Sequence, residues 1–138
     1  MSFASFQVLS TVMDKIYFTW EEFDKAVNII ADRIKDNKYN PKMIYGIPRG
    51  GLALALSLSH KMNVPIINGL GFRSRRILVV DDVSDSGNTL MNYARDCLTA
   101  TIHLRQGSKF IPDIWVYERP DNSWIVYPWE NKDEEIKL

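Results

Sequence analysis

One segment, residues 77–89 with the sequence ILVVDDVSDSGNT, constrains the fold of this chain more than any other. Its four apolar residues, most of them β-branched, predict a buried strand over residues 77–80. Asp81 and Asp82 follow at once, and a loop of small polar residues then leads to Gly87 and a helix. A strand that passes through such a loop into a helix is typical of an α/β fold with a parallel sheet.

The rest of the chain repeats this alternation. Thr19 and Glu22 have the spacing of a capping box, and apolar residues then recur at helical intervals, which predicts a helix near 20–36. Apolar runs predict strands at 43–47, 64–67, 99–104, 114–117 and 124–126, and helices from 52 to about 62 and from 87 to about 98. We therefore expect one α/β domain over residues 1–138. It has a mostly parallel twisted sheet flanked by helices, a small C-terminal hood segment and a solvated charged tail at 131–138.

Charge and composition exclude several classes of protein. Lys and Arg number 17, as do Asp and Glu, so the formal charge of zero argues against a general nucleic-acid binder. No apolar stretch approaches 18 residues and the N-terminal sequence does not resemble a signal peptide, so no membrane partner is expected. Cys97 is the single cysteine, and a cytoplasmic location fits these features.

The loop after the 77–80 strand has the chemistry of a phosphate site. In parallel α/β folds, ligands bind beyond the carboxyl ends of the strands. Amides at a helix start bind phosphate well, Gly87 allows close approach, and Ser86 and Thr89 can add hydroxyl donors. Asp81 and Asp82 suit ribose hydroxyls or a magnesium-bearing ligand. Any one of these residues could simply end a strand or cap a helix. That alternative explains the whole ordered string less well than a phosphate site does.

This string resembles the donor-binding signature of the type I phosphoribosyltransferase family. The resemblance implies that Asp81 and Asp82 hold the ribose hydroxyls and Mg²⁺, and that Asp85 is the general base or orients the base. It also implies a diphosphate-binding loop at residues 44–51, IYGIPRGG. The donor-binding residues implied in this way are Arg49, Gly50, Asp81, Asp82, Asp85, Ser86, Gly87, Asn88 and Thr89.

Residues 120–130, PDNSWIVYPWE, are similar to the end of the bacterial xanthine–guanine group of this family, and residues 17–21, YFTWE, are similar to its start. The similarity implies that Trp124 stacks on a purine and that Ile125 offers its backbone to the base. Arg105 takes the position of a base-contacting lysine, with Lys109 as the alternative donor. Three further tryptophans, Trp20, Trp115 and Trp129, are expected only to pack.

The resemblance as a whole implies an enzyme of purine salvage. Ribose 5-phosphate would pass from phosphoribosyl diphosphate to a 6-oxopurine with the help of Mg²⁺, and a homo-oligomer is expected. The family has a long flexible loop where this chain has only residues 68–76, whose Arg73, Arg75 and Arg76 either reach diphosphate or form a solvated turn. This shortening leaves open a non-catalytic module that binds a nucleotide or phosphoribose for regulation. A nucleoside kinase is disfavoured because no Gly-x-x-x-x-Gly-Lys-Ser/Thr loop is present.

Overall fold

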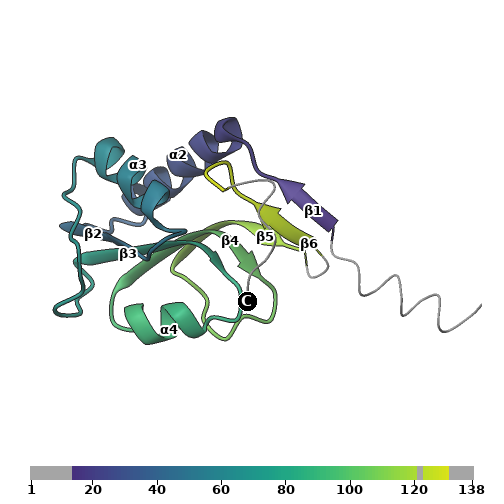
Figure 1. Cartoon of the computed structure of the whole chain (residues 1–138). Helices are drawn as coiled ribbons and strands as arrows, with labels where there is room; N and C mark the ends of the chain where they lie inside the picture. Colours follow the sequence, from purple (N-terminus) through teal and green to yellow (C-terminus); the bar gives the residue numbers. More distant parts are fainter. Residues whose placement is uncertain (1–13, 121–122, 131–138) are drawn as a thin grey trace, which may run out of the picture.

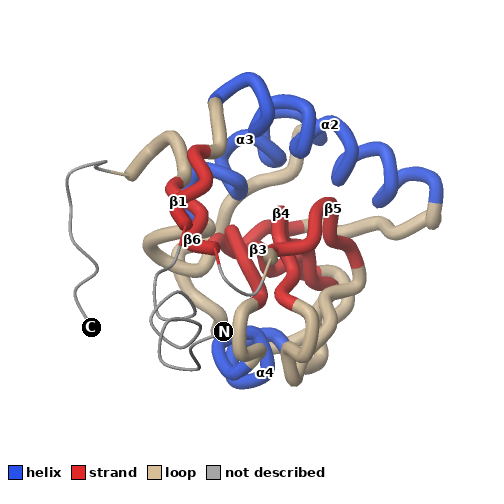
Figure 2. The backbone as a smooth tube through the Cα atoms, turned by 90° about the vertical axis from the view of Figure 1, so that its right-hand side faces the viewer, coloured by secondary structure: helices blue, strands red, loops and turns tan. Residues whose placement is uncertain are grey.

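The computed structural model describes residues 14–120 and 123–130, so the predicted solvated tail lies outside the described residues. Four parallel strands form the main sheet in the order β2 (Met43–Gly46), β3 (Ile77–Ser84), β4 (Leu98–Arg105) and β5 (Ile114–Arg119). Helices α2 (Trp20–Asp36) and α3 (Leu52–Met62) cover one face and α4 (Asn88–Ala94) the other (Figure 1, Figure 2). The described helices include none that is long and apolar enough to cross a membrane. The predicted α/β fold with a parallel sheet is confirmed.

The apolar strand β3 serves both layers of the core. Leu78 and Val80 join the cluster under α2 and α3, whereas Ile77 and Val79 join the cluster on the side of α4. Successive side chains of a strand point to opposite faces, so a strand buried on both faces must be apolar at every position. All four side chains are fully buried, which explains why the run contains no polar residue.

Helix α2 begins and ends as the sequence predicts. The Thr19 hydroxyl accepts a hydrogen bond from the Glu22 amide at 3.1 Å, and the Glu22 carboxylate accepts one from the Thr19 amide at 3.1 Å. These bonds satisfy donors that a helix start leaves without partners. The buried side chains of α2, spaced by three or four residues, are Phe23, Ala26, Val27, Ile30 and Ile34.

One predicted strand and two predicted boundaries are wrong. Residues 64–67 form no strand but only an isolated parallel bridge between Ile66 and Ile44, because Pro65 lacks the amide that a longer ladder needs. Helix α4 ends at Ala94 rather than near residue 98, because Leu98 is buried in β4 and pairs with Leu78. Strand β3 continues to Ser84, so the two carboxylates lie inside the strand and not after its end.

A second small sheet was not predicted in full. Strand β1 (Asp14–Tyr17) pairs in parallel with β6 (Ser123–Val126), and only β6 was expected from the sequence. All four residues of β1 are exposed, so its sequence lacks the apolar alternation that marks a half-buried strand. This sheet lies beside the carboxyl ends of the main sheet (Figure 1) and corresponds to the predicted C-terminal hood.

The order of the chain through the sheet creates a crevice. From β2 the chain passes through α3 to Ile66 on one side of β2, and then returns to β3 on the other side. Connections that leave neighbouring strands in opposite directions open a gap beyond the carboxyl ends of those strands. The residues that follow β2 and those at the end of β3 therefore face a shared space, and this space is the place to look for chemistry.

Candidate active site

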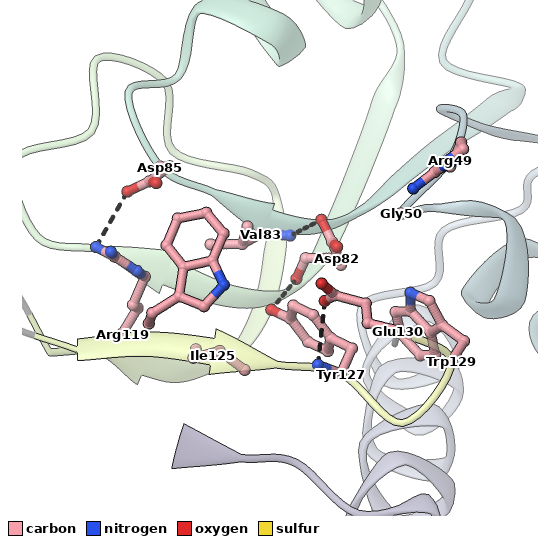
Figure 3. Close-up of a pocket in the computed structure, with 11 residues that line it drawn as sticks. Arg49, Gly50, Asp82, Val83, Asp85, Arg119, Ile125, Tyr127, Trp129 and Glu130 are labelled. Carbon is pink, nitrogen blue, oxygen red and sulfur yellow. Dashed lines mark hydrogen bonds and ion pairs between the residues drawn. The ribbon is translucent and has the colours of Figure 1, made fainter. Parts of the chain in front are cut away.

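Two adjoining cavities occupy this crevice. The larger has a volume of about 610 Å³ and the smaller about 210 Å³, and both are lined by Asp82, Val83 and Asp85. The other residues that line the larger cavity are Arg49, Gly50, Arg119, Trp124, Ile125, Tyr127, Trp129 and Glu130 (Figure 3). The smaller cavity is further lined by Asp81, Ser84, Ser86, Gly87, Thr89 and Leu90. A ligand with two parts could therefore occupy both cavities and bend at the shared residues.

The acidic pair lies where the cavities meet. The Asp82 amide donates to Oδ1 of Asp81 at 2.8 Å, and the Val83 amide donates to Oδ1 of Asp82 at 2.8 Å. Burial and then repulsion from Asp82 raise the pKa of Asp81 to about 8. Burial also raises the pKa of Asp82. Two ionised carboxylates are therefore unfavourable here without a compensating partner, and hydroxyl donors or a cation would supply one.

The donor set of this pair fits Mg²⁺. Magnesium is usually held by one or two carboxylates together with substrate phosphates rather than by a cage of protein ligands. Among residues 14–120 and 123–130, no group of three or more His, Cys, Asp or Glu side chains could enclose a metal ion. Asp81 and Asp82 could thus hold a magnesium ion that arrives with a phosphorylated ligand.

The smaller cavity is shaped by Gly87. Its φ of 89° lies in the left-handed region, and a Cβ at this position would stand 2.3 Å from the Phe110 amide nitrogen. The Lys109 amide also donates to the Ser86 carbonyl at 2.8 Å, which ties the loop to residues 108–110. Only glycine tolerates both this positive φ and this close approach of the Phe110 amide. The predicted phosphate loop is therefore held in place by its backbone and opens onto a small polar cavity.

The loop after β2 reaches the acidic pair from the other side. Arg49 and Gly50 line the larger cavity, as the sequence suggests for a diphosphate loop. A Cβ on Gly50 would lie 2.3 Å from Oδ2 of Asp82, so the backbone passes directly over that carboxylate. The Gly51 amide donates to the Ile47 carbonyl at 2.8 Å and closes the turn. An anion bound between Arg49 and a cation at Asp82 would have positive charge on two sides.

Asp85 is flanked by two guanidinium groups. Nε of Arg105 lies 2.8 Å from Oδ1 of Asp85, and Nη1 of Arg119 lies 3.2 Å from the same oxygen. Arg105 was predicted to contact the base, but it does not line the larger cavity. It supports Asp85 from the side, and its Nε also donates to the Asp85 carbonyl at 3.1 Å. Arg119, which the sequence did not single out, lines the larger cavity, as Arg49 does.

Aromatic side chains form the opposite wall of the larger cavity. Trp124 and Ile125, both predicted to contact a base, line it. Trp129 was expected only to pack; it does pack, since it stacks on Tyr127 at 5.0 Å with an interplanar angle of 7°, but it also lines the cavity. Flat apolar walls of this kind suit a planar heterocycle.

Buried hydrogen bonds connect this aromatic wall to β3, the strand that carries Asp81 and Asp82. The Tyr127 hydroxyl contacts Nδ1 of His103 at 2.8 Å and donates to the Asp82 carbonyl at 3.3 Å. Burial lowers the pKa of His103 to about 4. Burial also raises the pKa of Tyr127 well above its ordinary value. Both side chains are therefore neutral, and their hydrogen bonds hold Tyr127 beneath Asp82.

Residues 68–76 do not reach the site. Nη2 of Arg73 donates to the Asn92 carbonyl at 2.9 Å, and Nη1 of Arg75 donates to the Cys97 carbonyl at 3.0 Å and to Asp113 at 2.9 Å. None of the three arginines of this segment lines either cavity. The sequence left open whether this segment reaches diphosphate or forms a solvated turn. The structure is better described by the turn, although Arg73 and Arg75 are bound to the protein.

Val83, Ser84 and Leu90 line the smaller cavity without having been predicted, and the other residues that the sequence analysis missed lie on the base side. Tyr127 and Glu130 belong to the C-terminal motif, so their position in that motif was an available signal. Glu130 lines the cavity, and its Oε1 accepts from the Tyr127 amide at 3.1 Å. Arg119 had a weaker signal: it is a charged residue on the same side of β5 as Trp115 and Tyr117.

Comparison with known proteins agrees with this geometry. No family model matches the chain. A xanthine-guanine phosphoribosyltransferase of Idiomarina loihiensis is 25% identical over 143 residues, which cover 84% of this chain and 87% of that protein. The crystal structure of a purine phosphoribosyltransferase from Pyrococcus horikoshii matches with 30% identity and a TM-score of 0.74, over 91% of this chain and 100% of that one.

The Helicobacter pylori xanthine-guanine-hypoxanthine phosphoribosyltransferase, 22% identical, shares the fold with a TM-score of 0.69 over 84% of this chain and 93% of that one. The fold of this family and an almost complete alignment with one of its members therefore coincide with a strand, loop and cavity arrangement suited to a phosphorylated sugar and a planar base. The chain belongs to the type I phosphoribosyltransferase family and is a purine phosphoribosyltransferase.

Proposed function

We propose that this enzyme transfers ribose 5-phosphate from phosphoribosyl diphosphate to a 6-oxopurine (guanine, xanthine or hypoxanthine) and releases diphosphate. The observation that carries the proposal is that the two adjoining cavities share Asp82, Val83 and Asp85. The smaller, polar cavity takes the ribose phosphate and the larger, aromatic cavity takes the purine. The anomeric carbon then lies between them, where its bond to diphosphate oxygen breaks and its bond to a purine ring nitrogen forms.

In this proposal the donor is bound from three sides. The 5-phosphate accepts hydrogen bonds from the loop of residues 85–89, where the hydroxyls of Ser86 and Thr89 add donors. Asp81 and Asp82 accept from the ribose hydroxyls. Arg49 and the backbone at Gly50 bind the diphosphate, because a guanidinium forms bidentate contacts with phosphate oxygens. Asp81 and Asp82 would also hold Mg²⁺, which would supply positive charge against the departing diphosphate.

The base side supplies orientation and proton transfer. Trp124 stacks on the purine, an interaction worth roughly 1–3 kcal/mol per base. The Ile125 backbone offers hydrogen bonds to the ring edge. Asp85 faces both cavities and either accepts the proton that the ring nitrogen loses or orients that nitrogen toward the ribose. General acid–base assistance of this kind contributes roughly 10²–10⁴-fold to a rate.

The direct test is a transfer assay with a panel of bases. The purified protein is incubated with phosphoribosyl diphosphate, magnesium and each of guanine, xanthine, hypoxanthine, adenine and orotate, and the product is identified by mass. We expect the nucleotide of at least one 6-oxopurine, and none when magnesium is chelated. Transfer to orotate alone, or binding of nucleotide without turnover, would contradict the proposal. A structure with bound nucleotide should place its 5-phosphate at residues 85–89.

We also infer that the enzyme is a cytoplasmic homo-oligomer. Leu52 and Leu56, one turn apart on α3, are 51% and 53% exposed, so the start of this helix presents apolar surface to solvent. Burying such surface against a second copy would stabilise an assembly. Light scattering during gel filtration should report a mass of at least twice 16.0 kDa, and a Leu56→Glu variant should shift it toward the monomer.

A further inference from the structure

The pairing of the main sheet is interrupted at the acidic pair. In the register of β3 with β4, Asp81 pairs with Thr101 and Val83 pairs with His103, and Asp82 between them is skipped. The pairing of β3 with β2 ends one residue before the acidic pair. At this point the amides of Asp82 and Val83 donate to carboxylates, each at 2.8 Å. Side chains, as well as the sheet, therefore set the geometry of the pair.

One of these side chains is Tyr127, which contacts the peptide group between Asp82 and Val83. The Tyr127 hydroxyl donates to the Asp82 carbonyl at 3.3 Å, and the Val83 amide of the same peptide group donates to Oδ1 of Asp82 at 2.8 Å (Figure 3). A peptide group is planar, and its C=O and N–H point in opposite directions. A donor that fixes the carbonyl end therefore also fixes the direction of the amide that holds the carboxylate.

His103 determines the direction in which Tyr127 donates. A tyrosine hydroxyl has a single proton, and a carbonyl oxygen can only accept it. Nδ1 of His103, 2.8 Å from the Tyr127 oxygen, must then donate to that oxygen. Burial lowers the pKa of His103 to about 4, so the ring is neutral and its one proton lies on Nδ1. With the proton on the other ring nitrogen, His103 would attract the hydroxyl proton away from Asp82.

Aromatic packing holds Tyr127 in this position. Its ring stacks on Trp129 at 5.0 Å, and Phe18 packs edge-on against Tyr127 at 5.8 Å and against His103 at 5.0 Å. Tyr127 and His103 are both buried. A side chain locked by its neighbours holds a functional group more precisely than a mobile one does. The ring of Tyr127 lies in the wall of the base cavity, but its hydroxyl reaches the strand that carries the acidic pair.

We propose that Tyr127 is a positioning residue of the acidic pair, whose hydroxyl, oriented by His103, holds the Asp82 carboxylate in the direction in which it meets the donor. The inference rests on the proposed function, because that function assigns the ribose hydroxyls and magnesium to this pair. Loss of the hydroxyl should weaken binding of the donor and spare the purine. Loss of a base contact would do the opposite, and a general loss of structure would weaken both.

The experiment uses Tyr127→Phe, which removes the hydroxyl and keeps the ring on Trp129. Calorimetry gives the dissociation constant of phosphoribosyl diphosphate with magnesium, and turnover at saturating donor gives the KM for the purine. The loss of a hydrogen bond between neutral groups suggests a donor dissociation constant higher by about 2- to 10-fold, with the KM for the purine unchanged. Tyr117→Phe is the matched control, because the Tyr117 ring also contacts Phe18 and His103 but lines neither cavity. It should leave both values unchanged.

His103 provides a second pair of variants, which keeps the test open if Tyr127→Phe does not fold. His103→Asn retains an N–H donor and His103→Leu has none. We expect the leucine variant to weaken the donor as Tyr127→Phe does, with no further loss when the two are combined, and the asparagine variant to restore part of the affinity.

Unchanged donor affinity in Tyr127→Phe, equal weakening of donor and purine, or fully additive losses in the combined variant would overturn the inference. If Tyr127→Phe does not fold, unchanged donor affinity in His103→Leu would do the same. A wild type that transfers to no 6-oxopurine would instead refute the proposed function.

Discussion

The donor side and the base side of the crevice are built in different ways. The donor side consists of two short segments of neighbouring strands: residues 49–50 follow β2, and residues 81–89 form the end of β3 and the loop after it. The base side is assembled from the end of β5, from β6 and from the turn after β6, and β6 pairs with β1 from the other end of the chain. The local sequence therefore determines the donor side, whereas the base side depends on long-range packing.

The two sides also differ in charge. The donor side has an acidic pair, and burial raises the pKa of Asp81 to about 8. The base side has the buried Arg119 and aromatic walls. Magnesium bound together with phosphate groups would compensate the acidic pair, and a planar ring with acceptor atoms would suit the base side. If this division is correct, substitutions on each side should affect one ligand and spare the other.

The largest expected effect comes from Asp81→Asn combined with Asp82→Asn. Transfer should fall below detection, because the ribose hydroxyls and the magnesium ion both lose their carboxylates. Asparagine has the shape of aspartate, so the backbone at Gly50 still passes over residue 82, and the fold should persist with a melting temperature at pH 8 no lower than that of the wild type. Turnover with each single and double variant, together with circular dichroism, checks this.

The matched control is binding of the free base. The double variant should still quench its tryptophan fluorescence when a 6-oxopurine is added, since the base side is unchanged. Normal turnover in the double variant would refute the assignment of the acidic pair, and loss of base binding would refute the division between the two sides.

A smaller effect is expected from Trp124→Ala. Removing the stacking surface should cost about 1–3 kcal/mol of purine binding, which corresponds to a KM for the purine that is higher by a factor of about 5 to 150. The KM for the donor should change by less than about threefold. Trp115→Ala is the control, because Trp115 lines neither cavity. Equal weakening of both substrates would mean that Trp124 only packs.

This difference between the two sides also explains which features could be predicted from the sequence. The capping box at Thr19, the apolar strand and the loop around Gly87 are local patterns, and the structure places each of them as predicted. The extension of β3 through Asp81 was not predicted, because acidic residues ordinarily end a strand. In the structure, parallel pairing with β4 holds Asp81 beside Thr101 and carries the strand further.

The base side was harder to predict because its residues meet only in the folded chain. The resemblance implied Arg105 as the residue that contacts the base, whereas the arginine of β4 and β5 that lines the cavity is Arg119, 14 positions later on the neighbouring strand. The register between β4 and β5 pairs these two residues directly. A register between strands is set by packing and turns, and no local pattern in the sequence reports it.

The pH dependence of stability should show the cost of the acidic pair. A folded pKa of about 8 against an ordinary value of 3.8 means that folded Asp81 holds its proton more tightly than unfolded Asp81 does. Its contribution to stability is thus complete below about pH 4 and is lost as the pH rises toward 8. We expect the melting temperature of Asp81→Asn, relative to the wild type, to increase steadily over this range.

Magnesium with phosphoribosyl diphosphate should abolish most of that difference by favouring the ionised pair in the wild type. His103, whose pKa is lowered to about 4 by burial, titrates in both proteins and cancels in the comparison. A pH-independent difference between wild type and variant would mean that the acidic pair is better solvated than its burial indicates.

The smallest expected signal is hydrolysis of the donor in the absence of a base. A mobile loop that closes over a reacting centre excludes water and strengthens the electrostatics inside it. In this chain the corresponding segment, residues 68–76, is bound to the protein at Arg73 and Arg75 and lines neither cavity. Water can therefore compete with the purine for the anomeric carbon unless another chain covers the site.

The measurement is the ratio of ribose 5-phosphate to nucleotide formed by the purified enzyme, first without purine and then at saturating purine. We expect slow hydrolysis without purine, and less of it when the ring on Trp124 fills the larger cavity and displaces its water. If the acidic pair activates the donor for either acceptor, Asp81→Asn with Asp82→Asn should remove hydrolysis and transfer together, whereas Trp124→Ala should slow transfer alone and raise the hydrolysed fraction. Fast transfer with no hydrolysis by a monomeric form would show that the donor side excludes water by itself. The base side would then contribute affinity for the purine but no protection of the reacting centre.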